Sequence, residues 1–420
     1  MRKVIGVRKK QRDAEYSLFA RRESDSSRSM IFGYDFAMRL ICLCSSGAII
    51  AIWSLAVPAY AFERPGFAPC IQNPKICLGE LPKGFSDDVV DLPVVPVEEL
   101  QKKKVMFGTN RSVKSFKKSN NLSVISDMFS SDYSNYITTG YIVSEVLPNN
   151  NHNIDSKILS LDIDVVFFNE DKSLDEFIKS EIKNSHFLYV HGANNNFGSA
   201  INSALLMSDA ARMDITPIVF SWPTMQWWQW RRMIPIRNPY NHDVTTSGQS
   251  VAQFERFIGR ILSGGIDKLD IFAHSLGAQV VTRTLSTYIL KQDYEPRIRS
   301  VTYAAPDMDN IEFYNAYEEI FKNSDIKVTV YAHEEDLALY LSEFWNYHER
   351  VRSSGISAIG GHFEFINVGQ SGDILGHDFP TSNRRVSMDY REFLLSGKQA
   401  AERSALLRTG DYQYILQEDE

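Results

Sequence analysis

From about residue 170 onward, short apolar runs alternate with segments of helical spacing, and this alternation most constrains the fold. The apolar runs predict strands over residues 186–190, 217–220, 269–273, 300–304, 326–331 and 363–368. Helical spacing predicts helices over 174–182, 199–213, 247–262 and 278–290, with a further helix between residues 304 and 326. Strands that alternate with helices pair in parallel. The α/β pattern therefore predicts a mostly parallel central sheet with helices on both faces.

The chain before residue 170 carries fewer signals. A buried strand is predicted at 105–111, and two more are predicted at 136–146 and 163–168. The polar stretch 112–135 is predicted to be a loop. We therefore expect an α/β domain over 104–400 that includes an N-terminal β-containing extension, followed by a C-terminal tail over 401–420.

Residues 1–61 have the pattern of an export signal. The uncharged apolar run Leu40–Val57 follows a basic stretch and leads to the small residues Ala59 and Ala61 at the −3 and −1 positions. We predict cleavage after Ala61 and export to the periplasm or the medium, with Met1, Met30 or Met38 as the start. The alternative is a retained inner-membrane anchor, which would hold the α/β domain at the membrane outside the cytoplasm.

The Pro-rich segment 62–103 contains the two cysteines of the mature chain, Cys70 and Cys77. Cys42 and Cys44 lie in the apolar run of the leader. In an oxidising compartment, Cys70 and Cys77 are expected to form a disulfide. A zinc site is the weaker alternative, because no nearby His completes a ligand set.

The charge balance excludes some partners. The chain has 45 Lys and Arg against 52 Asp and Glu, a net charge of −7. Nucleic-acid binding needs a positive face, so we expect no nucleic-acid partner. The sequence contains no P-loop, no Gly-x-Gly-x-x-Gly and no His-Glu-x-x-His motif. We therefore expect neither a nucleotide cofactor nor a metal.

The segment Leu269–Gly277 predicts a strand, a tight turn and then a helix. Ser275 lies in the turn, with the small residues Ala273 and Gly277 on either side, as in a nucleophile elbow. Small residues suit these positions because the turn is strained and the helix starts close to the strand. The alternative is a buried or capping serine on an ordinary turn. The His-Gly turn at His191 and the acid and histidine candidates after residue 300 favour Ser275 as a nucleophile.

His191–Asn194 ends an earlier predicted strand. A His-Gly turn in this place would direct a backbone N–H at the nucleophile. We expect the N–H groups of Ala193 and Leu276 to form an oxyanion hole. His191 could itself be the base, but it precedes Ser275, so we expect it to orient the oxyanion loop instead.

The remaining triad members should follow the serine in the order acid, then His. His377 follows the last predicted strand and is expected to be the general base, whereas His362 lies at the opposite end of that strand. For the acid, Asp336 follows the next-to-last strand and Asp307 follows the strand before it. We choose Asp336 and keep Asp307 as the alternative, because both positions are used on such a fold.

Taken together, these motifs resemble those of the α/β-hydrolase superfamily, and more narrowly an uncharacterised bacterial subgroup of it. The resemblance covers about residues 105–380. It rests on Phe107–Arg111, His191–Asn194, Phe220–Pro223, Ala273–Gly277, Ala305–Asp307, Asp336 and Gly376-His377. It implies the α/β-hydrolase fold and the triad, but no substrate, because the fold hosts many functions.

Trp222, Trp227, Trp228 and Trp230 lie directly after a strand predicted to end near Ser275. One interpretation is a flap or wall that binds the acyl group of a substrate. The other is a packed excursion that buries its aromatic rings.

Three functions remain open at this point. The first is a serine hydrolase acting on a small-molecule carboxylic ester or a lipid-like acyl ester. The second is an acyltransferase that uses the same triad to pass the acyl group to an alcohol other than water. The third is an inactive envelope binding protein on a hydrolase fold, which the intact Ser, Asp and His disfavour.

Overall fold

The structure is a computed structural model that describes most of the chain from Gln101 to Gln417. The described ranges are 101–115, 122–146, 163–182, 187–210, 213, 215–226, 237–287, 297–322, 324–351, 363–369 and 375–417. The predicted export signal and the predicted Cys70–Cys77 disulfide therefore lie outside the described residues.

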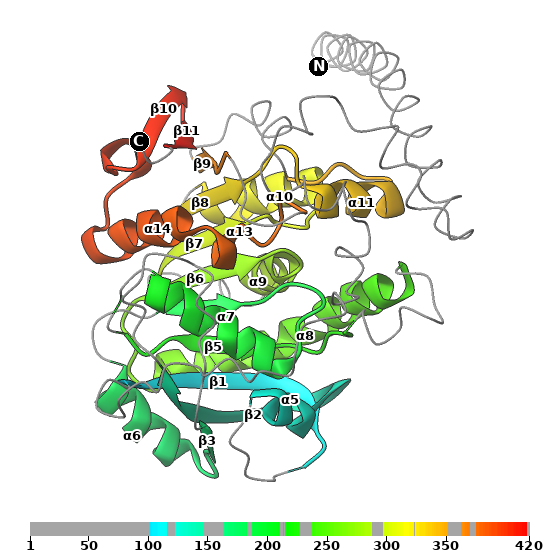
Figure 1. The fold of residues 1–420 in the computed structure, drawn as a ribbon, viewed down its shortest axis with the longest axis vertical. Helices are drawn as coiled ribbons and strands as arrows, with labels where there is room; N and C mark the ends of the chain where they lie inside the picture. The colour runs from blue at the N-terminus through cyan, green and yellow to red at the C-terminus, as the bar shows by residue number, and fades with distance from the viewer. Residues whose placement is uncertain are drawn as a thin grey trace, which may run out of the picture. The chain divides into compact units, whose positions relative to one another are not determined.

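The strands of the described residues form one eleven-stranded sheet in the order β10-β11-β9-β8-β7-β6-β4-β5-β1-β2-β3 (Figure 1). From β11 through β9, β8, β7, β6, β4 and β5 to β1, each strand pairs in parallel with the next. β2 pairs antiparallel with β1 and β3, and β10 pairs antiparallel with β11. The bounds are β1 Gln101–Val113, β2 Phe129–Val146, β3 Ile163–Phe167, β4 Phe187–Val190, β5 Ile218–Ser221, β6 Leu269–His274, β7 Ile298–Ala304, β8 Lys327–Ala332, β9 Glu364–Asn367, β10 Leu406–Gly410 and β11 Gln413–Leu416. The mostly parallel sheet predicted from the sequence is confirmed.

Helices cover both faces of this sheet, as the alternation predicted (Figure 1). Their bounds are α5 Leu122–Met128, α6 Asp171–Glu181, α7 Phe197–Ala210, α8 Arg237–Ser263, α9 Gly277–Thr287, α10 Asn310–Ala316, α11 Leu337–Asn346, α13 Phe379–Ser382 and α14 Arg384–Ser396. A π-helical turn, η6 (Tyr317–Phe321), extends α10, and a short 3₁₀ turn, η7 (Ala400–Glu402), follows α14.

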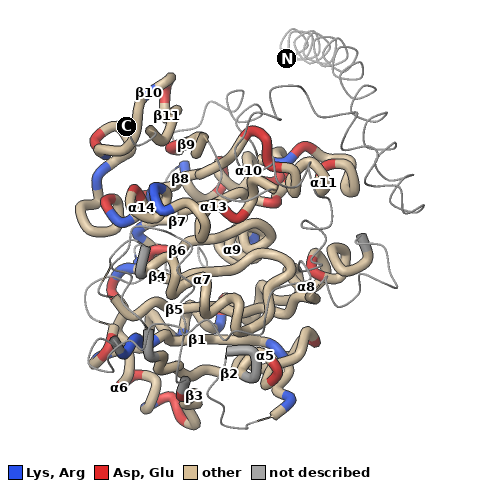
Figure 2. The backbone as a smooth tube through the Cα atoms, viewed as in Figure 1, with Lys and Arg blue, Asp and Glu red and all other residues tan. Residues whose placement is uncertain are grey.

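Successive residues of the central strands point into two separate cores, because side chains alternate across a strand. In β4, Leu188 and Val190 pack with residues of α6, α8 and α9. Phe187 and Tyr189 pack on the opposite face with residues of α5, α7 and α14. β4 and β5 carry no charged residue (Figure 2), which agrees with burial on both faces. The central sheet is thus a rigid support for the loops at its carboxyl edge.

The order of the central strands decides which loops meet. β4 lies between β5 and β6, so the chain leaves β4 toward one side and later returns to its other side. A crevice forms at such a reversal, outside the carboxyl ends of the strands. The turn after β4, which holds His191, and the turn after β6, which holds Ser275, therefore lie next to each other.

Three sequence expectations are corrected by the fold. The predicted loop 112–135 instead contains the end of β1, the helix α5 and the start of β2. The helix predicted at 247 starts ten residues earlier, as α8, although its first half is polar. The predicted tail 401–420 contributes β10 and β11, and β11 pairs in parallel with β9. Each element depends on a distant partner: α5, for example, buries Ile125 and Met128 in the core that also holds α7.

Candidate active site

Ser275 occupies a strained turn between β6 and α9. Its φ angle is 53°, in the left-handed region that non-glycine residues rarely adopt. The backbone N–H of Ser275 donates to Ala304 O at 3.0 Å, and the N–H of Asp307 donates to Ser275 O at 3.2 Å. Two backbone hydrogen bonds to neighbouring segments thus hold the turn in this conformation.

Two glycines allow the chain to pass close to the turn. A Cβ on Gly192 would lie 2.5 Å from Cβ of Ser275, and a Cβ on Gly277 would lie 2.6 Å from Val190 O. Both distances are far below van der Waals contact. The glycines at these positions therefore let the turn after β4 and the start of α9 pack directly around Ser275.

The structure brings Ser275, His377 and Asp336 into one hydrogen-bonded chain. Nε2 of His377 is 2.9 Å from Oγ of Ser275, and Nδ1 of His377 is 2.7 Å from Oδ2 of Asp336. Asp336 is fully buried, and its other oxygen accepts the N–H of Leu339 at 2.9 Å as the N-cap of α11. These are the contacts that nucleophile, base and acid make in a serine triad.

His377 lies on a loop that a glycine and another histidine hold in place. Gly376 has a φ of 70°, and a Cβ there would come within 2.8 Å of Nδ1 of His333. His274, which precedes the serine, donates from Nε2 to the carbonyl of His377 at 3.1 Å. The imidazole is consequently fixed from its backbone as well as by Asp336.

The environment of His377 changes its pKa. Burial alone lowers the pKa, but the negative charge of Asp336 and the hydrogen bond to its carboxylate outweigh burial and raise the pKa to about 9. The side chain is 17% exposed, so the ring is reachable from solvent. The charged imidazolium is therefore strongly favoured next to Asp336.

The two predicted oxyanion donors lie in turns beside the serine. Ala193 follows Gly192, which contacts Ser275, and Leu276 follows Ser275 directly at the start of α9. Within the described ranges, no acceptor is present for the N–H of either residue. The first N–H groups of a helix have no partner inside the helix, and the helix dipole is positive there. Leu276 lies at such a helix start, whereas Ala193 belongs to the turn after β4.

His191 is fully buried, and His377, not His191, occupies the position next to Oγ of Ser275. Its Nδ1–H donates to Gly192 O at 2.7 Å, and its Nε2 accepts the N–H of Trp222 at 3.1 Å. Burial lowers the pKa of His191 well below its ordinary value, and the charge of Arg111 lowers it further. The ring is therefore neutral and supports the turn after β4, and it is not a proton acceptor for Ser275.

Asp307, the alternative acid, makes a different set of contacts. Its carboxylate accepts from Tyr240 Oη at 2.9 Å and from Ser342 Oγ at 2.6 Å, and it forms an ion pair with Arg350, whose Nε lies 3.0 Å away. Only its backbone N–H reaches the turn at Ser275. The side chain is engaged by an arginine, so the geometry favours Asp336 as the partner of His377.

Trp222 corrects the expectation that it lines a substrate site. It is fully buried, its ring stacks on that of His191 at 5.3 Å, and its indole N–H donates to His191 O at 2.7 Å. Trp222 thus supports the turn after β4 through His191. Trp227, Trp228 and Trp230 lie outside the described residues.

Two supporting residues were missed by the sequence reasoning. Arg111 and Asp243 are both buried and both contact the loop after His191. Arg111 ends the motif Phe107–Arg111, which by itself indicates no role for it. Asp243 lies in a polar stretch with no motif. The sequence offers one signal for each, a charged residue next to an apolar strand or inside a helix.

No described helix combines the length and the apolar character that crossing a bilayer requires. Among the described residues, no group of three or more His, Cys, Asp or Glu side chains is placed to hold a metal ion.

Comparison with known proteins identifies the family but no activity. No curated protein matches the chain. Similar solved structures include an uncharacterised protein from Bacillus cereus ATCC 10987, with 16% identity, a TM-score of 0.35, and coverage of 54% of this chain and 68% of that one. A putative cell surface hydrolase from Lactobacillus plantarum WCFS1 has 13% identity and a TM-score of 0.32, and the match covers 52% of this chain and 94% of that one.

A family model described as "Alpha/beta hydrolase of unknown function (DUF900)" matches residues 167–386. This range includes Ser275, Asp336 and His377, and it spans just over half of the chain. The protein therefore belongs to this family of α/β hydrolases of unknown function.

Proposed function

We propose that this protein is a serine hydrolase that cleaves a carboxylic ester or a lipid-like acyl ester. The observation that carries the proposal is the chain of hydrogen bonds from Ser275 through His377 to Asp336. A serine hydroxyl is a weak nucleophile until a base takes its proton, and His377 is within reach of that proton.

The proposed reaction has two halves. Neutral His377 takes the proton of Ser275 as Oγ attacks the ester carbonyl, and the N–H groups of Ala193 and Leu276 stabilise the oxyanion. His377 then protonates the departing alcohol, which leaves an acyl group on Ser275. Water, activated by the same imidazole, attacks this acyl-enzyme and releases the acid and free Ser275. Asp336 stabilises the imidazolium in both halves.

Fluorophosphonate labelling with peptide mapping tests the nucleophile. We expect the label on Ser275, and we expect Ser275→Ala and His377→Ala each to reduce hydrolysis of p-nitrophenyl esters by up to about 10⁶-fold. The double variant should be little worse than either single variant, because triad residues act as one unit. Ser208→Ala is the matched control, since Ser208 is fully buried in α7 and donates to Leu205 O.

The outcomes separate the competing functions. Labelling of a serine other than Ser275, or full turnover by Ser275→Ala, would remove this mechanism. Labelling of Ser275 without hydrolysis of any ester would favour the acyltransferase alternative. Absence of both labelling and turnover in the wild-type protein would favour the inactive binding protein.

We also propose that the mature protein is exported, on the basis of the leader over residues 1–61. Amino-terminal sequencing of the protein from its host should begin at Phe62, and Cys70 and Cys77 should resist alkylation until reduced. An intact leader in a membrane fraction would indicate the anchored form. An intact leader in the cytosol, with both thiols free, would contradict export.

A further inference from the structure

The oxyanion loop, defined as Gly192–Asn196, depends on hydrogen bonds from outside itself. Asn194 has a φ of 57°, a left-handed conformation that asparagine tolerates better than most residues. Nδ2 of Asn195 donates to Ala193 O at 2.9 Å, and Nδ1 of His191 donates to Gly192 O at 2.7 Å. These local bonds use the carbonyl groups of the loop, but they leave the N–H of Asn194 to another partner.

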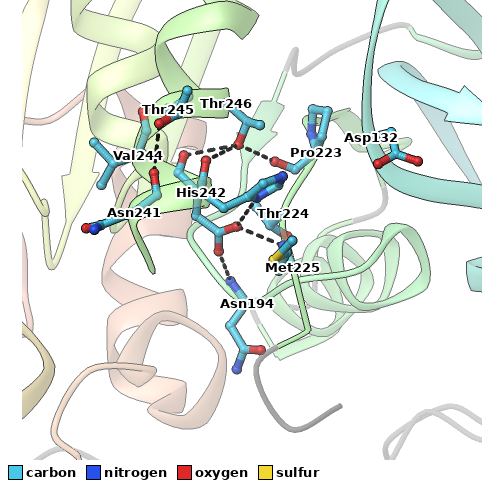
Figure 3. Close-up of polar contacts among 12 residues, drawn as sticks. Asp132, Asn194, Pro223, Thr224, Met225, Asn241, His242, Val244, Thr245 and Thr246 are labelled. Atoms are coloured by element: carbon cyan, nitrogen blue, oxygen red, sulfur yellow. Dashed lines mark hydrogen bonds and ion pairs between the residues drawn. The ribbon is translucent and has the colours of Figure 1, made fainter. Parts of the chain in front are cut away.

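Asp243 of α8 supplies that partner. Its Oδ2 accepts the N–H of Asn194 at 3.0 Å, and its Oδ1 accepts the N–H of Met225 at 2.8 Å. Figure 3 marks both contacts by dashed lines that end at Asn194 and Met225. His242 adds Nδ1 to the same Oδ1 at 3.2 Å. One fully buried carboxylate thus connects the oxyanion loop with the segment after β5.

A second charge holds the other side of the loop. Nη2 of Arg111 donates to Asn195 O at 2.7 Å, and Thr224 Oγ1 donates to the same oxygen. Burial lowers the pKa of Arg111 to about 9, while the charge of Asp243 acts in the opposite direction. Hydrogen bonds that involve an ionised group are roughly twice as strong as neutral ones. Two consecutive residues of the loop are therefore held by side chains of opposite charge, Asn194 by Asp243 and Asn195 by Arg111.

The part of α8 that carries Asp243 is itself attached to the segment after β5. Thr246, three residues further along the helix, donates from Oγ1 to Pro223 O at 2.8 Å, as Figure 3 also shows. The carboxylate is consequently held in place by its helix. It has little freedom to follow the loop if the loop moves.

We propose that Asp243 is a positioning residue that keeps the Ala193 N–H directed at the oxyanion above Ser275. The inference rests on the proposed function, since it assigns Ala193 as an oxyanion donor. Asp243 touches no reacting atom. It holds Asn194 in its left-handed conformation, and release of that N–H would free the peptide unit next to Ala193 to rotate. The predicted consequence is loss of transition-state stabilisation without loss of substrate binding.

The experiment compares Asp243→Asn with wild type in p-nitrophenyl ester hydrolysis, normalised to the fraction of sites that fluorophosphonate labels. The amide oxygen of Asn can accept one N–H, but its NH₂ would face the other. We expect kcat per labelled site to fall by about 10- to 100-fold with KM nearly unchanged, less than the 10²–10³ for removing a donor outright. Asp243→Ala should lose more, and if it does not fold, Asp243→Asn decides the matter.

Hydrogen exchange gives a readout that does not depend on ester turnover. Peptides covering residues 191–197 should exchange faster in Asp243→Asn, while peptides of β6 should not change. Asp270→Asn is the matched control, because Asp270 is equally buried at the start of β6 and pairs with Arg299 at 2.6 Å. It should lower stability but leave both kcat per labelled site and exchange of the loop unchanged.

Unchanged exchange over 191–197, or a kcat per labelled site within about twofold of wild type, would overturn the inference. An equal effect of Asp270→Asn would also overturn it, since the effect would then be one of general stability. If wild-type protein neither labels nor turns over an ester, the proposed function fails. The exchange result then still decides whether Asp243 positions the loop.

Discussion

The regions around Asp336 and Asp307 differ although they begin alike. Each carboxylate follows the carboxyl end of a parallel strand, β8 and β7 respectively, and each is almost fully buried. Asp336 receives Nδ1 of His377 and an N–H of its own helix. Asp307 receives a guanidinium and two hydroxyl groups.

The comparison teaches that the partner, and not the position, decides what a buried carboxylate can do. A carboxylate paired with a titratable imidazole can stabilise a charge that appears during a reaction. A carboxylate paired with Arg350 is already neutralised by a permanent charge. The Asp307 region therefore ties β7 to α8 and α11, and its link to the proposed chemistry is the backbone N–H that holds Ser275 O.

The largest effect on activity is expected from Asp336→Asn. Because the amide would hold the imidazole of His377 in the wrong tautomer, kcat for ester hydrolysis should fall by about 10⁴-fold. Asn can still accept the N–H of Leu339, so the folded structure should be retained. Steady-state kinetics and circular dichroism measure the two effects. A larger loss of kcat in Asp307→Asn would transfer the role of acid to Asp307.

The pH dependence of ester hydrolysis tests the effect of Asp336 on His377 directly. Only neutral His377 can take the proton of Ser275, so kcat/KM should rise with pH until about 9, and at pH 7 it should be about 100-fold below its plateau. In Asp336→Asn, the midpoint of the residual activity should move down toward about 6.5, the ordinary value for histidine. A wild-type midpoint already near 6.5 would contradict the assigned effect of Asp336.

Stability should follow the opposite trend over this range. The folded-state pKa of His377 lies above its unfolded value, so its contribution is fully present below about pH 6.5 and is lost as the pH rises through about 9. Urea unfolding at several pH values measures this trend. The wild type should lose stability relative to His377→Ala as the pH rises.

The smallest effect on activity is expected from Asp307→Asn. The substitution leaves the buried guanidinium of Arg350 without its carboxylate, which should cost about 3–5 kcal/mol of unfolding free energy. Tyr240→Phe removes one hydrogen bond to the same carboxylate and should cost about 1 kcal/mol. Both variants should keep kcat per labelled site within a few-fold of wild type. A kcat loss of several hundredfold in Asp307→Asn at unchanged stability would break the comparison.

Much of the fold could be predicted because its signals are local. The apolar runs of β4 and β5 are short and continuous, as expected of strands buried on both faces. The turn at Ser275 is marked by its small neighbours, Ala273 and Gly277. The order serine, acid, histidine along the chain then limited the candidates for the other two residues.

The missed elements lack such local signals. β11 pairs with the edge of β9 that β8 does not occupy. A four-residue strand has no sequence signal strong enough to predict that pairing. The first half of α8 is polar, with Pro239 and Gly248 among its residues. In the folded protein, this half of α8 is attached through Asp243 and Thr246 to the segment after β5, and its sequence pattern does not reveal that contact.

By itself, the sequence determined the α/β architecture, the strained turn at Ser275 and the short set of candidate partners, because neighbouring residues encode burial period and turn geometry. Only the tertiary structure decided that Asp336 contacts His377, that Arg350 neutralises Asp307, and that Trp222 is buried behind His191. The reason is physical. A hydrogen bond between residues 41 positions apart depends on how strands pair and helices pack, and no local pattern specifies that distance.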